Sequence, residues 1–278
     1  MQNWQNKIKN NEPVLMAILN ISPDSFFDGG VYNSKTGIKK RIEEFQTHGV
    51  DIIDIGAESS RPGAHPVNEA QELKRLLPVL EIVKNMTEIP VSIDTYKPGV
   101  ALKCLENGAD IVNDIYGTRK PGMKEILAEY QVPVIIMHMN GEPSSMQENP
   151  MSGNQVDDVI DFLEKSAEEN IHAGVMAENI VLDPGIGFGK EQDLNLRLIS
   201  ETRRLKKLGY PLLIGASRKS LIGAMLDVPK QDRMLGSVLV NMMALLNGYN
   251  IVRTHDIKET MQMIKVFNSF KYQTVNIY

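Results

Sequence analysis

Eight short apolar segments lie along this chain, and each ends in polar residues that a buried strand does not need. The segments are rich in Val, Ile and Leu without alternation, which is typical of strands buried on both faces of a parallel sheet. They read VLMAILN, DIIDIGAESSR, PVSIDT, DIVNDI, PVIIMH, IVLDP, PLLIGASRK and IVRTH. Stretches long enough for a crossover helix separate them. The pattern predicts an α/β fold, a single (β/α)8 TIM barrel domain over residues 1–278.

The polar endings of these segments would meet at one place. In a TIM barrel the carboxyl ends of all strands converge on one mouth, where the active site lies. The predicted pocket residues are Asn20, Asp54, Glu58, Arg61, Asp94, Asn113, Asp114, His138, Asp183, Ser217, Arg218, Lys219, Arg253 and His255. The connections 21–37, 57–72 and 139–155 are dense in Gly, Pro, Ser and Asn, as functional loops are.

Composition restricts the class of protein. A net charge of −5 and a pI near 5.6 argue against a general nucleic-acid surface, so an anionic substrate would need a local basic cluster. The single cysteine, Cys104, excludes a disulfide framework and shares a predicted helical face with Ala101 and Leu105, which favours a buried apolar role. The polar N-terminus lacks the apolar core of a signal peptide. A soluble, cytoplasmic protein is expected.

Three acceptor-rich residues end strands of the predicted barrel, namely Asp94, Asn113 and Asp183. A carboxylate in a largely apolar mouth is costly unless it meets a donor. A ligand with several N–H donors, such as an aminopyrimidinone, fits three such groups, because one carboxylate can accept two adjacent donors. The alternative is that each residue caps a helix N-terminus. For all three together, capping is the weaker interpretation.

An anion site is predicted where the first and last strands become neighbours. Asn20 ends the first strand, while Arg253 and His255 alternate along the last one and precede a helix N-terminus. Arginine, histidine and a helix N-terminus together suit phosphate. No His/Cys cluster suggests a structural zinc. A Mg²⁺ that bridges substrate phosphates remains open, and Asn20 is the expected protein ligand.

Basic and glycine-rich segments complete the pocket prediction. Of Ser217, Arg218 and Lys219, which follow the seventh strand, Lys219 is expected to face the pocket. His138 would either line the pocket or occupy an interior layer. The segment GIGFGK at residues 185–190 meets neither the P-loop spacing nor the Rossmann fingerprint, so its glycines are interpreted as tight-turn residues.

One predicted helix is apolar nearly all round. Residues 238–246 are apolar apart from Asn241, whereas an outer barrel helix normally has one face on water. Cover by a second subunit would explain this, so a homodimer is expected. Packing against neighbouring helices is the alternative.

With these residues in view, the chain resembles the dihydropteroate synthase family of folate biosynthesis. The matching segments are MAILNISPDSFFDGG, DIIDIGAESSRPG, SIDT, VND, LDPGIGFGK, IGASRKSLIG and IVRTHD. The resemblance implies a Mg²⁺-dependent transferase that condenses 6-hydroxymethyl-7,8-dihydropterin diphosphate with p-aminobenzoate, giving 7,8-dihydropteroate and diphosphate, and that is a target of sulfonamides.

The resemblance also implies roles for individual residues. It implies that the pterin is held by Asp94, Asn113, Asp183 and Lys219. It implies that the diphosphate is bound by Arg253 and His255, with Asn20 at the metal and the diphosphate. It implies further substrate-binding residues, namely Ser217, Thr254, and Ser60 and Arg61 of a second mobile loop, the first being residues 20–27. Catalysis is assigned to Asp94, Lys219, Arg253 and His255.

The chain departs from the family pattern without losing a charged group. Phe27, Ala57, Ser60 and Thr254 stand where serine, glycine, threonine and valine are usual, and Ala57 restricts a backbone that needs to flex. A pterin-binding methyltransferase is a rival, but such enzymes handle no diphosphate and do not need SRK and RTH. A non-catalytic pterin-binding paralogue is a second rival, which turnover would distinguish.

Overall fold

A closed ring of parallel strands forms the centre of the computed structural model, which describes residues 3–21, 35–59, 63 and 66–271. The strands are β1 (Val14–Asn20), β2 (Ile52–Gly56), β3 (Val91–Asp94), β4 (Ile111–Asp114), β5 (Val134–Met137), β6 (Ile180–Asp183), β7 (Leu213–Ile214) and β8 (Ile251–Thr254). Their order is β6-β5-β4-β3-β2-β1-β8-β7. A bridge between Leu182 and Leu212 joins the two ends of this order. The predicted (β/α)8 barrel is therefore confirmed.

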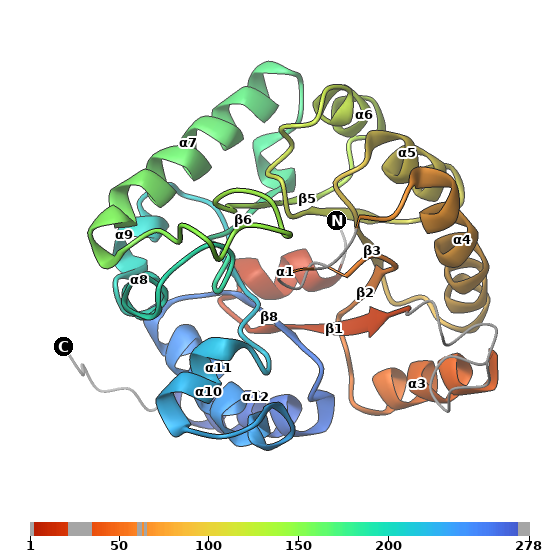
Figure 1. Cartoon of the computed structure of the whole chain (residues 1–278). Coiled ribbons are helices and arrows are strands. Elements are labelled where there is room, and N and C mark those ends of the chain that lie inside the picture. Colours follow the sequence, from red (N-terminus) through yellow and green to blue (C-terminus); the bar gives the residue numbers. More distant parts are fainter. Residues whose placement is uncertain (1–2, 22–34, 60–62, 64–65, 272–278) are drawn as a thin grey trace.

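Helices surround the strands in a ring (Figure 1). They are α1 (Asn3–Lys9), α3 (Lys35–Thr47), α4 (Glu69–Met86), α5 (Pro98–Glu106), α6 (Met123–Tyr130), α7 (Val156–His172), α8 (Gln192–Ser200), α9 (Thr202–Lys206), α10 (Ser220–Leu226), α11 (Met234–Asn247) and α12 (Ile257–Lys271). Among the described residues, none of these helices has the length and apolar character that a membrane crossing requires.

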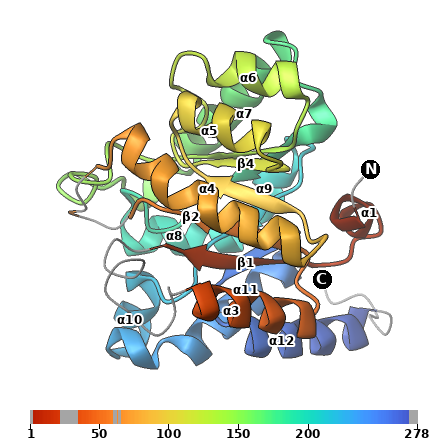
Figure 2. The same ribbon diagram turned by 90° about the vertical axis from the view of Figure 1, so that its right-hand side faces the viewer.

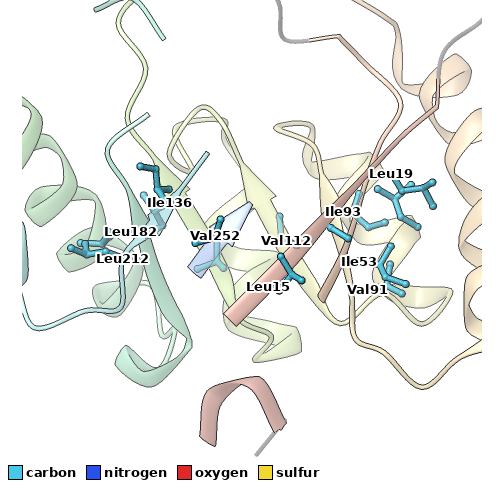
Figure 3. Packing of buried hydrophobic residues seen from close by; sticks show 14 of the residues in the cluster. Leu15, Leu19, Ile53, Val91, Ile93, Val112, Ile136, Leu182, Leu212 and Val252 are labelled. Carbon is cyan, nitrogen blue, oxygen red and sulfur yellow. The ribbon is translucent and has the colours of Figure 1, made fainter. Parts of the chain in front are cut away.

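Side-chain alternation along each strand divides the apolar core into two parts. Successive side chains of a strand point to opposite faces. The outward set packs beneath the helices and includes Leu15, Ile53, Ile93, Val112 and Val252 (Figure 3). Cys104 of α5 is buried in the same layer. Burial raises the pKa of its thiol to about 12, as expected for an apolar packing residue.

The inward set fills the end of the barrel at which the strands begin. It consists of Val14, Met16, Ile52, Ile111, Ile135, Val181, Leu213 and Ile251, together with Trp4 of α1. Trp4 is only 3% exposed. In Figure 2, α1 lies beside the start of β1, and the arrow of that strand points away from it. The short N-terminal helix therefore closes the barrel end opposite the mouth.

Two strands are shorter than the apolar segments suggested. β7 contains only Leu213 and Ile214, and the segment that follows it includes Arg218 at φ 55°. β8 ends at Thr254, so the prediction that His255 alternates with Arg253 on the strand is wrong. His255 and Lys219 of the predicted pocket thus lie in the loops that follow β8 and β7.

Candidate functional site

The mouth of the barrel carries a layer of polar side chains directly above the inward apolar layer. Strand register aligns the inward positions, with Asn20 beside Gly56, Gly56 beside Asp94, and Asp94 beside Asn113. Asp183 of β6 pairs with Met137, and Arg253 of β8 pairs with Met16. Each of these polar residues lies two positions after an inward residue of its strand. The change from apolar to polar along the interior therefore places the predicted residues around one cavity mouth.

Arg253 links two acidic side chains of this layer. Its Nε donates to Asp54 Oδ2 at 2.6 Å, and its Nη2 donates to Asp94 Oδ2 at 2.6 Å. Burial alone would lower the pKa of the guanidinium, but the two carboxylates outweigh burial and raise it above its ordinary value. Arg253 is thus a permanent positive charge held in place by two acidic side chains.

Asp54 is a predicted pocket residue for which the sequence indicates no particular role. In the structure it is fully buried, binds Arg253, and accepts from Asn113 Nδ2 at 3.3 Å. Its Oδ1 is buried without a hydrogen-bond partner among the described residues. Its inward position two residues after Ile52 is the signal that could have identified it.

Gly56 permits the close approach of two predicted residues. A Cβ atom at this position would lie 3.3 Å from Asn20 Oδ1 and 3.4 Å from Asp94 Cβ. The missing side chain therefore leaves Asn20 and Asp94 on either side of one backbone position. This glycine was not selected from the sequence.

The acidic residues of the mouth do not cap helices. Asp183 Oδ1 accepts from the Gly185 backbone N–H at 2.7 Å, within the loop that follows β6. Burial raises the pKa of Asp183, against the opposing effect of Lys219. Burial likewise raises the pKa of Asp94 to about 7, although Arg253 lowers it. The helices that follow β3 and β6 have Lys97 and Glu191 at their N-cap positions, so the helix-capping alternative does not describe either carboxylate.

Lys219 faces the mouth as predicted, and the loop after β6 holds it there. Its Nζ donates to the Ile186 carbonyl and lies 4.2 Å from the centroid of the Phe188 ring. Burial lowers the pKa of Lys219 to about 8, while Asp183 raises it. The ammonium group thus lies within the electrostatic influence of Asp183 and next to an aromatic face.

The glycine-rich segment 185–190 serves as a tight turn that carries Phe188 and Ile186. Gly185 has φ +68°, and a Cβ atom there would collide with the His138 carbonyl. Lys190 is buried, and its Nζ donates to the carbonyls of His138, Gly185 and Phe188 at 3.0–3.2 Å. The lysine of GIGFGK fixes the turn internally, in agreement with the rejection of a nucleotide-binding motif.

His138 lies outside the mouth. The residue follows β5 with the same orientation as outward-facing Ile136, and its ring contacts Phe162 of α7 edge-on at 4.9 Å between centroids. Burial lowers its pKa strongly, so the imidazole stays neutral. His138 is therefore a helix-facing residue and neither lines the pocket nor belongs to an interior layer of the barrel.

Ser217, Thr254 and His255 form a group beside Arg253. Thr254 is outward-facing and fully buried, and its hydroxyl contacts Ser217 and Thr260. Its side chain therefore supports the site from behind, and the substrate contact that the resemblance implies for Thr254 stays a prediction. Ser217 Oγ lies 3.1 Å from His255 Nδ1, so Ser217 also acts on a neighbouring site residue.

Some predicted residues lie outside the described part of the chain. Ser60, Arg61 and residues 22–34, which include Phe27, are not among the described residues, so their predicted roles stay predictions. Among the residues that the structure describes, no three His, Cys, Asp or Glu side chains gather to hold a metal ion. Asn20 remains the candidate ligand, with an exposed side chain at the end of β1.

A larger hollow lies at the opposite end of the barrel. Trp4, Ile8 and Tyr210 line much of it, and none of the predicted site residues does. A smaller hollow adjoins the mouth and is lined by Asp94, Thr95, Tyr96 and Ile115, together with Glu58 and Glu72. The predicted site residues lie at the mouth, and none of them lines the larger hollow. The mouth is therefore favoured as the functional site, although the other hollow is larger.

Comparison with known proteins agrees with this site. Residues 16–255 match the family described as pterin binding enzyme. The dihydropteroate synthase of Haemophilus influenzae is 41% identical over 257 residues, which cover 92% of this chain and 94% of the relative. The structure of the Yersinia pestis dihydropteroate synthase with a sulfonamide drug superimposes with a TM-score of 0.88, at 38% identity and 94% and 95% coverage of the two chains.

A third comparison concerns a complex with 7,8-dihydropteroate. This is the dihydropteroate synthase of Burkholderia cenocepacia, which has a TM-score of 0.85, 38% identity and coverage of 94% of this chain and 92% of its own. The relatives thus match the described fold over nearly their whole length. The chain belongs to the pterin binding enzyme family and, within it, to the dihydropteroate synthases.

Proposed function

We propose that this chain condenses 6-hydroxymethyl-7,8-dihydropterin diphosphate with p-aminobenzoate to give 7,8-dihydropteroate and diphosphate, with the residues of the mouth in the roles below. The observation that carries this assignment is the polar layer around Arg253, which combines buried carboxylates with a lysine at one barrel mouth. The relatives and the product complex support the same reaction.

The pterin is assigned to the side of the mouth formed by β4 and β6. Asp183 and Asn113 are nearly fully buried, and their oxygen atoms suit the ring N–H and amino donors of an aminopyrimidinone. Lys219 adds a donor for the acceptor atoms of the same ring, and Phe188 lies beside it. Asp94 completes this set at the end of β3.

The diphosphate is assigned to the side formed by β1 and β8. Arg253 uses Nε and Nη2 for Asp54 and Asp94, and a guanidinium has further N–H donors for an anionic oxygen. His255 lies next to it and adds a ring nitrogen. When the pterin C–O bond breaks, positive charge develops on the pterin and negative charge on the diphosphate. Arg253 and His255 then stabilise the diphosphate, and the carboxylates of the mouth stabilise the pterin.

Asn20 suits a magnesium ion bound mainly through the substrate. Its exposed side-chain oxygen is a hard donor at the diphosphate side of the mouth, and Mg²⁺ in phosphate sites often keeps only one or two protein ligands. When bound, the ion would supply charge neutralisation for the departing diphosphate. Asn20, Arg253 and His255 together would orient that group.

The reaction can be tested directly with purified protein. The protein is mixed with the dihydropterin diphosphate, p-aminobenzoate and MgCl₂, and dihydropteroate and diphosphate are quantified. Equal amounts of both products, lost on addition of EDTA and restored by Mg²⁺, are the expected result. Tight binding of the pterin diphosphate without product would contradict the proposal and favour a non-catalytic pterin-binding protein.

A homodimer through α11 belongs to the same proposal. Leu235, Leu239, Met243 and Leu246 recur along one face of this helix and are 54–64% exposed. Contiguous exposed apolar faces mark interaction surfaces. Sedimentation velocity should give a dimer for the wild type and a monomer for Leu239→Lys. Ile171→Lys, at an exposed apolar residue of α7, is the control and should leave the dimer intact.

A cytoplasmic location is part of the same proposal. A cytoplasmic location suits the single, buried cysteine. Fractionation of cells that produce the tagged chain would test it.

A further inference from the structure

A line of buried hydroxyl groups ends at the imidazole of His255. Ser217 Oγ lies 3.1 Å from His255 Nδ1 and accepts from the His255 backbone N–H at 3.2 Å. Behind it, Thr254 Oγ1 lies 3.4 Å from Ser217 Oγ, and Thr260 Oγ1 lies 3.4 Å from Thr254 Oγ1. Ser217 is nearly buried, and both threonines are fully buried. These hydroxyl groups must therefore satisfy one another.

Two backbone N–H groups determine in which direction the hydroxyl groups of this line donate their protons. The Asp256 N–H donates to Thr254 Oγ1 at 3.1 Å, and the His255 N–H donates to Ser217 Oγ. A backbone N–H can only donate, so it occupies a lone pair of each hydroxyl oxygen. With Thr260 donating to Thr254 and Thr254 donating to Ser217, the Ser217 oxygen is fully engaged as an acceptor. The proton of Ser217 then points to His255 Nδ1.

The direction of this line determines which nitrogen of His255 carries the proton. A neutral imidazole has one N–H, and the hydrogen bond made by one ring nitrogen sets the state of the other. If Nδ1 accepts from Ser217, the proton resides on Nε2. Burial and the positive charge of Arg253 lower the pKa of His255 to about 4, against Asp256, with smaller lowering effects from Arg218 and Lys230. The ring is therefore neutral near pH 7.

We propose that Ser217 is a positioning residue that holds His255 as the neutral Nε2–H tautomer, so that this side chain meets the diphosphate as a hydrogen-bond donor. The identity of the ligand rests on the proposed function, whereas the tautomer does not. The opposite tautomer would present a lone pair to an anionic oxygen and repel it. The hydroxyl line thus converts a neutral histidine into a donor without adding another charge beside Arg253.

The tautomer is measured by ¹⁵N NMR on the full chain labelled with ¹⁵N-histidine. Protonated and unprotonated ring nitrogens have well-separated shifts, and the His255→Gln variant identifies the signals of His255. Near pH 7 we expect an unprotonated Nδ1 and a protonated Nε2. A protonated Nδ1 in the wild type would overturn the proposal, whatever the activity of the protein.

Variants test whether Ser217 sets this state. Ser217→Ala should populate both tautomers, and Ser217→Thr, which keeps the hydroxyl, should restore the wild-type signals. Ser166→Ala, at a buried serine of α7, controls for the loss of a buried hydroxyl and should leave His255 unchanged. An unchanged tautomer in Ser217→Ala would also overturn the proposal.

Calorimetry with inorganic diphosphate and MgCl₂ provides the functional measurement. Loss of one neutral hydrogen bond corresponds to about a twofold to tenfold weaker affinity. Ser217→Ala should show this loss for diphosphate and none for a pterin that lacks the diphosphate. Absence of diphosphate binding by the wild type would refute the proposed function alone, because the NMR result is independent of it. Equal diphosphate affinity of the wild type and Ser217→Ala would overturn the positioning role.

Discussion

At the scale of single residues, Asp183 has a structural contact with Gly185 and a proposed contact with the pterin, which substitutions can separate. One oxygen holds Gly185, and the carboxylate as a whole is assigned to two donors of the pterin. Asp183→Ala should weaken pterin binding by at least about a hundredfold, because each charged hydrogen bond contributes about 1.5–3 kcal/mol. Isothermal titration calorimetry with the pterin measures this. Asp183→Asn is the matched control, since the amide oxygen still accepts from Gly185, whereas an NH2 group, which cannot accept a ligand donor, replaces the second carboxylate oxygen. Equal affinity of Asp183→Ala and wild type would refute the pterin assignment.

Lys219 provides a prediction about pH. Burial lowers its pKa from the ordinary 10.5 to about 8, so the ammonium form prevails below pH 8 and the neutral amine above it. We expect kcat/KM to fall above pH 8, because fewer donors and less positive charge then reach the pterin. The folded protein binds fewer protons than the unfolded chain between pH 8 and 10.5, so the contribution of Lys219 to stability rises with pH across that window. In Lys219→Arg the alkaline fall near pH 8 should disappear from the residual activity. Its persistence would assign the fall to another group.

The sequence predicted most of these side chains and missed those whose role depends on distant contacts. Asp94, Asn113 and Asp183 end apolar segments, and this local pattern is visible without a structure. Asp54 acquires its role from Arg253, which is 199 residues away. For Thr254 the resemblance implies a substrate contact but not the orientation of its side chain, which is outward like that of Val252. Neighbours in sequence on a strand face opposite ways.

At the scale of elements, α1 shows what local patterns cannot reveal. Seven residues are too few to display helical periodicity, and the polar N-terminus gave no indication that Trp4 packs beneath the barrel. Trp4→Ala should lower the free energy of unfolding by about 3–5 kcal/mol, the usual cost of removing a buried large aromatic side chain. Urea unfolding followed by circular dichroism measures it. Asn6→Ala, at an exposed position of the same helix, should cost little. Equal stability of the two variants would show that α1 does not contribute to the barrel.

The strands, in contrast, were predicted well because their signal is local. Seven of the eight apolar segments gave strands of four residues or more, and β7 kept two residues of a much longer apolar segment. The chain after β7 leaves the strand, with Arg218 in the left-handed region and bound to Asp256 through Nε at 3.1 Å. A tertiary ion pair, which the sequence does not display, thus holds the segment that follows the shortened strand.

At the scale of the whole molecule, the repeated strand and helix units predict the fold, whereas closure of the barrel depends on contacts between the two ends of the sheet. Eight buried segments separated by helices predict a barrel irrespective of register. The polar mouth then requires that all eight strands keep one direction and that β1 lie between β2 and β8, as the strand order shows. Arg253 reaches Asp54 only because of this closure. The site is therefore a property of the complete ring.

This dependence leads to a prediction about unfolding, which also tests the proposal that residues 1–278 form a single domain. Trp4 is the only tryptophan of the chain, and it belongs to the buried cluster that inward residues of seven of the eight strands form. Its fluorescence therefore reports the barrel end opposite the mouth, while circular dichroism reports all helices. In urea the two signals should change with the same midpoint and the same slope, as for one cooperative unit. Measurement of wild type and Leu239→Lys at equal concentrations separates this transition from dissociation of the proposed dimer. A fluorescence transition at clearly lower urea would show that α1 detaches as a separate unit before the barrel opens.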